Sequence, residues 1–205
     1  MTDTRQKILD SAERLIAENG YSATSLRQII GEAGVNLASV HYHFGSKEEL
    51  LNELVKRKAE PVNQERLALL DSYIKDAQGA PIPMEKLLRA FLSPMGRKAN
   101  DNPQFVRVMG RIMVEGLLPA VVQKNFQPVL TRFTSAMRQS LPHLSDEEFE
   151  WRVHFMIGAM AHTMCGVPHG DFEARLERLV VFLSAGFRAP VSGDVRHTEE
   201  VERCV

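Results

Sequence analysis

The sequence contains only two cysteines, Cys165 and Cys204, and the second lies in a charged C-terminal segment. Two distant cysteines form no disulfide framework, which excludes the small cysteine-rich scaffolds and favours a reducing compartment. No run of eighteen apolar residues occurs, so we expect no membrane span. The N-terminal segment is charged and amphipathic and lacks the apolar core of a signal peptide. These absences predict a cytoplasmic protein with no membrane partner.

An excess of charge of one sign is also lacking, since 25 Lys and Arg face 26 Asp and Glu in the 205 residues. The net charge of −1 gives no sign of nucleic-acid binding. The distribution of charge is more informative, because Glu32 is the only acid between Ser22 and Lys47. A surface built from this segment would be locally non-acidic and rich in small hydrogen-bond donors.

Sustained β-type alternation and internal repeats are absent as well, so we predict an all-α fold. All ten prolines lie beyond residue 60, which indicates a compact N-terminal unit followed by a longer, more interrupted one. The apolar periodicity predicts helices over Arg5–Asn19, from about Ser25 to before Gly34, Leu37–Tyr42, from Lys47 past Pro61 to about Ala77, Met84–Lys98, Phe105–Glu115, Pro119–Ser140, Asp146–Cys165 and Phe172–Phe187.

Capping residues mark the starts of three of these helices. Ser25 with Gln28 has capping-box spacing, although Thr24 could equally be the cap, and Ser46 with Glu49 repeats the pattern. Asn36 is a good cap for the short helix between them.

The second and third helices, joined by a short turn at Gly34, form a candidate helix-turn-helix unit. The outward face of the third helix carries short or flat side chains with hydrogen-bonding tips: Asn36, Ala38, Ser39, His41, Tyr42 and His43. Such side chains allow close approach to base edges in a major groove. His41, Tyr42, His43 and Lys47 could reach phosphates, and Lys47 lies at a helix N-terminus that favours an anion. The same pattern is compatible with a three-helix packing unit that binds nothing.

Segment 20–29 followed by 33–35, and segment 40–50, resemble the TetR family of transcriptional regulators, and the similarity extends over about residues 5–55. This resemblance implies a homodimer that binds double-stranded operator DNA, usually as a repressor. It implies a helix-turn-helix domain over 1–47, a helical ligand-binding and dimerisation domain over 48–189 and a polar tail over 190–205. The implied DNA contacts are Thr24, Ser25 and Arg27 near the backbone, Asn36, Ala38 and Ser39 at the start of the recognition helix, and Tyr42, His43 and Lys47 on phosphate. His41 departs from the family, where tyrosine is commonest, which would alter a phosphate contact or the pH response.

The last two predicted helices, Asp146–Cys165 and Phe172–Phe187, carry more apolar surface than the rest of one chain could easily bury. The first is apolar nearly all round from Val153 onwards but too short to span a bilayer. The resemblance implies that both pair with their copies in a four-helix, twofold interface. The predicted interface residues are Phe155, Ala159, Leu176, Leu179, Val180, Leu183 and Phe187. The alternative is that both helices belong to the core of the single chain.

Methionine is frequent in the second half and adapts to irregular shapes, which suits a pocket for a flexible apolar ligand. We expect a wall of Phe91, Met109, Met113, Phe126, Leu130, Met156 and Met160, with Arg107, Arg111 or His154 for an acidic head group. Ordinary core filling is the alternative, and Arg111 has the spacing to pair with Glu115 instead. Segments 149–160 and 182–186 resemble the fatty-acid-responsive branch of the family, which implies a fatty-acyl effector.

Other classes of function have weaker support. No nucleophile elbow, phosphate loop or HExxH motif occurs, so we expect neither an enzyme nor a cofactor. His162, Cys165 and His169 have the spacing of metal ligands on one helix face, which would suit a metal-responsive regulator, but Gly166 and Pro168 would end that helix first. A dimeric helical scaffold without DNA binding is a further alternative.

Overall fold

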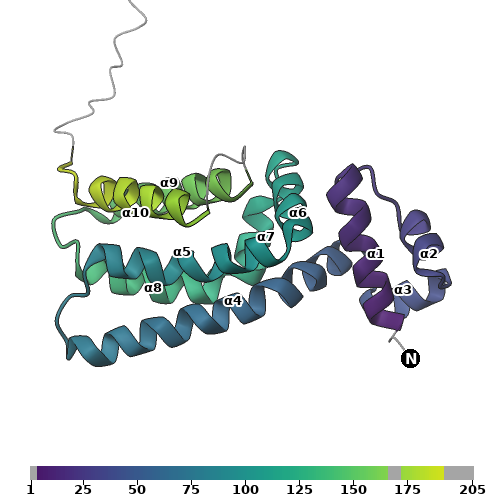
Figure 1. Cartoon of the computed structure of the whole chain (residues 1–205), viewed down its shortest axis with the longest axis horizontal. Helices are drawn as coiled ribbons and strands as arrows, with labels where there is room; N and C mark the ends of the chain where they lie inside the picture. The colour runs from purple at the N-terminus through teal and green to yellow at the C-terminus, as the bar shows by residue number, and fades with distance from the viewer. Residues whose placement is uncertain (1–3, 166–171, 192–205) are drawn as a thin grey trace, which may run out of the picture.

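The computed structural model describes residues 4–165 and 172–191, and within these ranges it contains only α-helices and no strand (Figure 1). The all-α prediction is therefore confirmed. The helices are α1 (Thr4–Asn19), α2 (Leu26–Ala33), α3 (Leu37–Phe44), α4 (Lys47–Ala77), α5 (Met84–Asp101), α6 (Pro103–Val114), α7 (Leu118–Asn125), α8 (Gln127–Gln139), α9 (Asp146–Cys165) and α10 (Phe172–Arg188). None of the helices described is long and apolar enough to cross a membrane.

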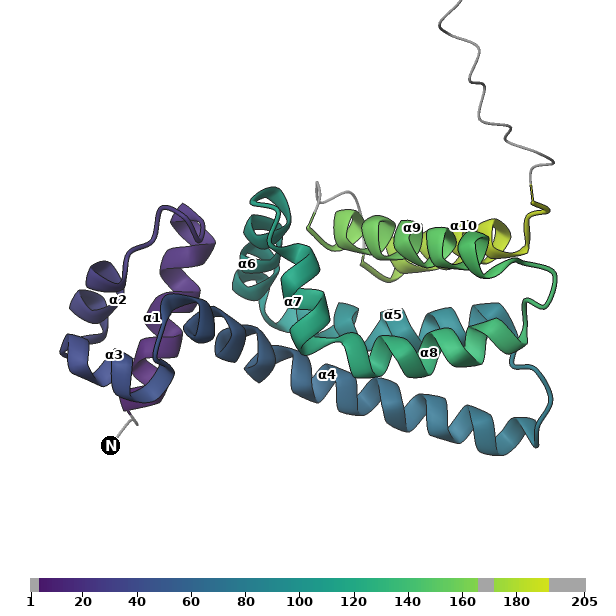
Figure 2. The same cartoon turned by 180° about the vertical axis from the view of Figure 1, so that it is seen from behind.

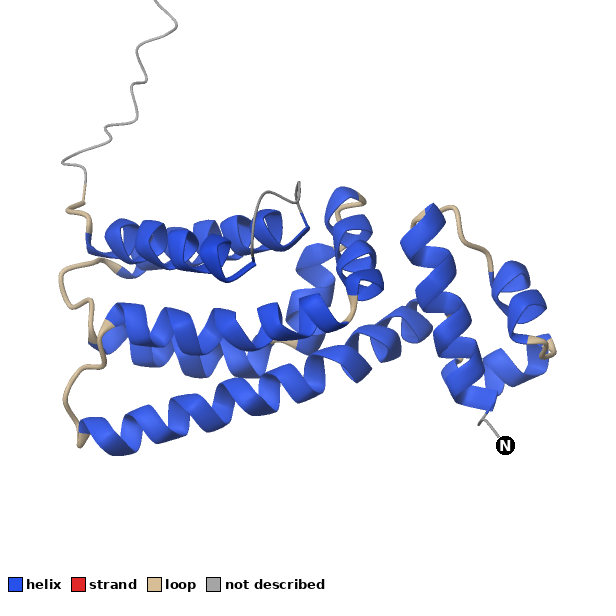
Figure 3. Ribbon diagram, viewed as in Figure 1, coloured by secondary structure: helices blue, strands red, loops and turns tan. Residues whose placement is uncertain are grey.

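Helices α1–α3 gather at one end of the molecule, and the long helix α4 leads away from them beneath α5 and α8 (Figures 1 and 2). Helices α9 and α10 pack on the other side of α5. Helices α6 and α7 stand between the two groups, with α6 directly against α1 (Figure 3). The long helix α4 thus connects the three N-terminal helices to the larger bundle, which contains α4–α10.

Short-range signals set the starts of α2, α3 and α4 as predicted. The Ser25 hydroxyl accepts from the backbone N–H of Gln28, whose side chain accepts in return from the Ser25 N–H, so Ser25 is the cap rather than Thr24. Asn36 caps α3, its Oδ1 accepting from the N–H of Ser39 at 2.9 Å. Ser46 caps α4 in the same way. These caps satisfy amides that a helix N-terminus leaves unpaired.

The single helix predicted over Pro119–Ser140 is wrong, since the structure has two helices there, α7 and α8. Phe126 separates them with φ −125° and ψ −13°. Pro128 explains the break, because it has no N–H to donate and its ring would clash with the carbonyl of Lys124 in a continuous helix.

Two hydrophobic cores form, and they do not divide at residue 47. The first contains α1–α3 but also Leu50 and Leu54 of α4 and Val108 and Ile112 of α6. The second lies among the end of α4, α5, α8, α9 and α10. The N-terminal helices are therefore packed directly on α4 and α6, so a movement of α4 or α6 would displace α1.

Candidate nucleic-acid interface and ligand cavity

Helix α3 separates a buried face from an exposed polar face. Val40 and Phe44 are buried in the first core, whereas the Tyr42 side chain is 86% exposed. Asn36, Ala38 and His41 are also exposed, and Ser39 and His43 are half-buried. The exposed residues carry short or planar side chains, so the helix backbone could approach a groove closely. The structure thus brings together on one surface the α3 residues that the sequence singled out.

Thr24 does not belong to this surface, which corrects the prediction that it contacts DNA. Its side chain is only 1% exposed, and its hydroxyl donates to the carbonyls of Gly20 at 2.7 Å and Leu15 at 3.2 Å. It therefore fastens the start of α2 to the end of α1. Ser25 and Arg27 are exposed at the start of α2, although the Ser25 hydroxyl is occupied in the capping box.

Lys47 is engaged inside the chain. Its ammonium donates to the Tyr21 carbonyl at 2.5 Å and lies 4.1 Å from the centre of the Tyr21 ring. Burial lowers the pKa of Lys47, while the charge of Glu115 opposes this shift. A phosphate contact by Lys47 would therefore require it to leave the Tyr21 carbonyl.

The end of α6 is hydrogen-bonded to the turn between α1 and α2. The Glu115 carboxylate accepts from the backbone N–H of Tyr21 at 2.7 Å and of Ser22 at 2.8 Å, and from the Ser22 hydroxyl at 2.6 Å. Burial would raise the pKa of Glu115, but these hydrogen bonds and the charge of Lys47 outweigh it, so the pKa is lowered. Charge-assisted bonds of this kind are about twice as strong as neutral ones.

Arg111 completes this contact by donating to the Glu18 carbonyl at 2.9 Å. The alternative that Arg111 pairs with Glu115 within α6 is not what the structure has, because Arg111 reaches the end of α1 and Glu115 reaches the turn after it. Gly20 is required there twice over: its φ is +90°, and a Cβ at this position would lie 2.5 Å from Glu115 Oε1. We call this set of contacts the α1–α6 joint.

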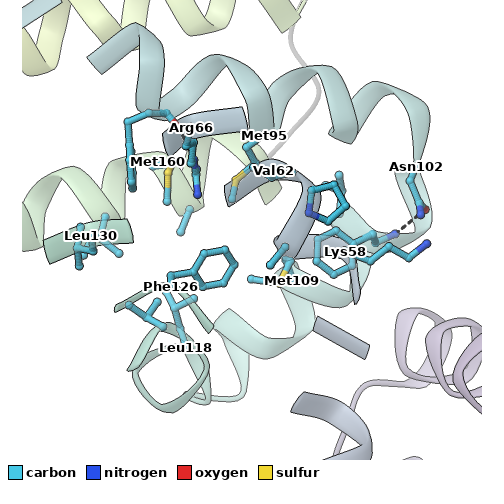
Figure 4. A pocket seen from close by; sticks show the side chains of 18 of the residues that line it. Lys58, Val62, Arg66, Met95, Asn102, Met109, Leu118, Phe126, Leu130 and Met160 are labelled. Carbon is cyan, nitrogen blue, oxygen red and sulfur yellow. Dashed lines mark hydrogen bonds between the residues drawn. The ribbon is translucent and has the colours of Figure 1, made fainter. Parts of the chain in front are cut away.

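A cavity of about 360 Å³ lies behind the joint, among helices α4–α9 (Figure 4). Its wall is mostly apolar and consists of Arg57, Lys58, Ala59, Pro61, Val62, Arg66, Phe91, Met95, Asn102, Phe105, Val106, Met109, Leu118, Val122, Phe126, Leu130, Ile157, Met160 and Ala161. The size and apolar lining are typical of a small-molecule site. Because Phe105, Val106 and Met109 belong to α6, the helix that lines the cavity also carries the α1–α6 joint.

Five of the ten residues predicted for the ligand site line this cavity: Phe91, Met109, Phe126, Leu130 and Met160. The other five do not, which corrects their assignment. Met156 is fully buried in the second core, and Met113 lies outside the wall. Arg107 is exposed, Arg111 is in the joint, and His154 is exposed beside the ring of Trp151.

The cavity wall contains one completely buried arginine, Arg66, which the sequence analysis missed. Nε donates to the Phe91 carbonyl at 2.6 Å, Nη1 donates to Asn63 Oδ1 at 3.2 Å, and Nη2 has no partner. Burial lowers the pKa of Arg66 to about 9. The spacing of Val62, Arg66 and Leu70 on the buried stripe of α4 was the available signal, because it places an arginine where the helix is otherwise apolar.

The opposite end of the cavity reaches α1. Arg57 and Lys58 line the wall there, and both pair with the buried carboxylate of Glu13, at 2.8 and 3.1 Å. Asn102 donates to the same carboxylate at 3.2 Å. Arg57 also pairs with Asp10 of α1 at 2.8 Å, so a cluster of two cations and two carboxylates connects this end of the cavity to the N-terminal helices.

The predicted dimer surface is only partly exposed. Leu176, Leu179, Val180, Leu183 and Phe187 are buried inside the chain, so for these five the core alternative holds. The reason is that this stripe of α10 packs on α5. Phe155 is 61% exposed and Ala159 is half-buried.

The exposed apolar side chains of this region lie on a different face. Phe182 is 69% exposed, and Trp151, Phe155 and Val181 are more than half exposed. Trp151 and Phe155 stack at 5.9 Å on α9. We call Trp151, Phe155, Val181 and Phe182 the α9–α10 patch. Exposed apolar side chains that gather on a surface can mark an interaction site.

The candidate metal ligands are not brought together in the part of the chain that the structure describes. His162 is exposed on α9, while the side chain of Cys165 and all of His169 lie outside the described residues. Among the described side chains, no group of three potential ligands is close enough to hold a metal ion.

Two family models match the chain. The model described as bacterial regulatory proteins, tetR family, matches residues 8–54, and the model described as tetracyclin repressor-like, C-terminal domain, matches residues 85–186. The first covers α2 and α3, and the second covers most of the cavity-bearing helices.

Similar curated proteins carry regulator names. The HTH-type transcriptional regulator LmrA of Bacillus subtilis is 37% identical over 86 residues, or 42% of this chain and 46% of LmrA. AcrR of Shigella flexneri is 44% identical over 52 residues, or 25% of this chain and 24% of AcrR. The chain thus matches less than half the length of these relatives.

Solved structures match over nearly the whole chain. A TetR-family regulator from Shewanella sp. PV-4 has a TM-score of 0.62 at 21% identity, covering 90% of this chain and 96% of that one. The fatty acid degradation regulator FadR from Bacillus halodurans has a TM-score of 0.62 at 16% identity, covering 92% and 98%. At these identities the likeness shows the fold.

Proposed function

This chain belongs to the TetR family of bacterial regulatory proteins, and from that premise we propose that it is a ligand-responsive repressor that binds double-stranded operator DNA. The family is one of regulators rather than enzymes. The observation that carries the proposal is the exposed face of α3, where Tyr42 is 86% exposed above buried Val40 and Phe44. In this proposal α3 enters the major groove with Asn36, Ala38 and Ser39 towards the bases, and Tyr42 and His43 at the backbone.

The DNA-binding unit is a homodimer in this proposal. The α9–α10 patch exposes aromatic and branched side chains from two neighbouring helices, and the same patch on a second copy would cover them in an isologous, twofold contact. Two recognition helices would then meet two half-sites about one helical turn of DNA apart.

The cavity is the proposed effector site, for a small apolar or fatty-acyl compound. Among similar proteins, one is named a fatty acid degradation regulator and another a nicotine-responsive repressor. Helix α6 supports the coupling, because it lines the cavity and carries the α1–α6 joint. A ligand that favours a shifted α6 would tilt α1–α3, and a difference of a few kcal/mol between the two states is enough to release DNA.

Selection of duplexes from a random library by the purified full chain tests this proposal. We expect enrichment of a twofold-symmetric sequence, whose affinity is then measured by fluorescence anisotropy with and without candidate effectors. The Tyr42→Ala variant is the control for binding through α3. Failure to enrich any sequence would overturn the repressor proposal and favour a scaffold without DNA binding.

A further inference from the structure

The side chain of Arg66 is a buried cation without an anion. It is completely buried in the wall of the cavity, and among the described residues no carboxylate lies within ion-pair distance of it. Its only contacts are to neutral groups: the Phe91 carbonyl, Asn63 Oδ1 and the face of the Phe91 ring, 4.2 Å from the guanidinium carbon. One nitrogen, Nη2, has no hydrogen-bond partner.

Burial of an unpaired charge is costly, and proteins normally balance it. The same cavity shows such a balance at its other end, where two carboxylates, Glu13 and Asp10, face the two cations Arg57 and Lys58. Arg57 Nε and Arg66 Nη2 are both buried without a hydrogen-bond partner, but of these two arginines Arg57 has carboxylate partners and Arg66 has none among the described residues. Its burial also lowers its pKa to about 9, which leaves it charged at neutral pH.

The rest of the wall determines what kind of anion would fit. Apolar side chains make up much of the lining that includes Arg66, among them Val62, Met95, Leu130 and Met160, which are labelled in Figure 4. A single guanidinium with one free nitrogen can compensate one negative charge, whereas a phosphate dianion would need further donors. The remainder of the ligand would lie along a mostly apolar wall, because the other polar side chains in it, Arg57, Lys58 and Asn102, already contact Glu13.

We propose that the cavity binds an amphipathic monocarboxylate, with the carboxylate on Arg66 and the apolar body along the methionine- and phenylalanine-rich wall. This rests on the proposed function only in taking the cavity as the effector site. A free acid and its neutral derivatives would then differ sharply in affinity, since an ester, an amide or an alcohol leaves the guanidinium uncompensated.

Isothermal titration calorimetry on the full chain with decanoate, decanamide and 1-decanol tests this inference. We expect decanoate to bind at least about tenfold more tightly than either neutral probe, which is the usual size of a hydrogen bond to a charged group. In Arg66→Met, whose unbranched side chain fills similar space, the preference for decanoate should disappear. The matched control is Arg89→Met, an exposed arginine of α5 paired with Glu177, which should keep the wild-type preference.

Two further measurements keep the result interpretable. Arg66→Lys retains the positive charge but loses the planar set of guanidinium N–H donors, so its preference for decanoate should be reduced but not lost. This variant keeps the inference testable even if Arg66→Met does not fold. Thermal unfolding without ligand should show Arg66→Met no less stable than wild type, because the variant removes an uncompensated charge. Equal affinity of wild type for all three probes, no binding of decanoate, or a preserved preference in Arg66→Met would overturn the inference. Operator binding is measured separately, so such a failure leaves the repressor proposal standing.

Discussion

The N-terminal helices and the cavity-bearing helices differ in whether their buried polar groups have partners. In α1–α3 the Thr24 hydroxyl is hydrogen-bonded inside, and buried Glu13 faces two cations. In the larger bundle Arg66 is buried without an anion beside an open cavity. An unsatisfied buried group costs about 1–3 kcal/mol, which a suitable ligand can recover. The buried polar groups named in the first region already have partners, whereas Arg66 in the second could gain one from a ligand.

Among the changes considered, separating the two copies of the proposed dimer should reduce operator affinity most. Phe182→Asp places a charge in the α9–α10 patch, far from α3. We expect a monomer with an intact fold and about a 100-fold loss of operator affinity, because two half-sites are no longer bound together. Sedimentation velocity and anisotropy measure the two effects. Val191→Asp, at an exposed valine outside the patch, is the control, and a dimeric Phe182→Asp protein would contradict the assigned surface.

Tyr42→Ala should weaken DNA binding without altering either region's fold. Because we assign Tyr42 to the DNA backbone, specific and random duplexes should lose affinity equally, by about tenfold for a hydrogen bond to a charged phosphate. Ile74→Ala, at an exposed residue of α4 away from α3, should change nothing. A loss confined to the preferred operator would instead assign Tyr42 to base recognition.

Thr24 tests how strongly its buried hydrogen bonds stabilise the N-terminal region. Thr24→Val keeps the shape but removes the donor to the Gly20 carbonyl, which should lower the free energy of unfolding by about 1 kcal/mol. Thr24→Ser should restore most of it. Chemical denaturation measures both variants, and a wild-type stability for Thr24→Val together with weaker DNA binding would return Thr24 to the interface.

Short-range chemistry made much of the N-terminal region predictable. Caps such as Ser25 and Asn36 act on amides two or three residues away, so their sequence spacing is enough to locate a helix start. The face that α10 buries was predictable too, but periodicity does not say whether Leu179 and its neighbours are buried by α5 or by a second chain. The break at Phe126 was missed because the effect of Pro128 on the preceding turn was not weighed.

The cavity was harder to predict because its wall draws residues from six consecutive helices, between residues 57 and 161. Methionines and phenylalanines suggested a pocket, but only packing decides that Met160 faces it while Met156 faces the core. Arg66 was not predictable from its type alone, because most arginines on a long helix face solvent and only the packing of α4 buries this one. An arginine on a buried stripe is a signal that sequence analysis can use.

Glu115 gives the smallest but most specific test, because the α1–α6 joint is where the two regions meet. Its pKa is lowered in the folded chain from an ordinary value of 4.5, so its contribution to stability is present above pH 4.5 and is lost as the pH falls through the lowered value. Glu115→Gln keeps one acceptor for Tyr21 or Ser22 but loses the charge that attracts Lys47. We therefore expect wild type to be more stable than the variant by about 0.5–1 kcal/mol at neutral pH, the usual size of one hydrogen bond.

This stability difference should vanish on acidification, since protonated Glu115 and glutamine are then similar in charge. Thermal unfolding of both proteins between pH 3 and pH 7 measures it, with Glu150→Gln, an exposed carboxylate of α9, as the matched control. A difference that persists at low pH would mean that glutamine disturbs packing at Gly20 rather than removing a charge-assisted contact. If wild type and variant were equally stable at every pH, the joint would be no stronger than an ordinary surface contact, and α6 would need another route to move α1.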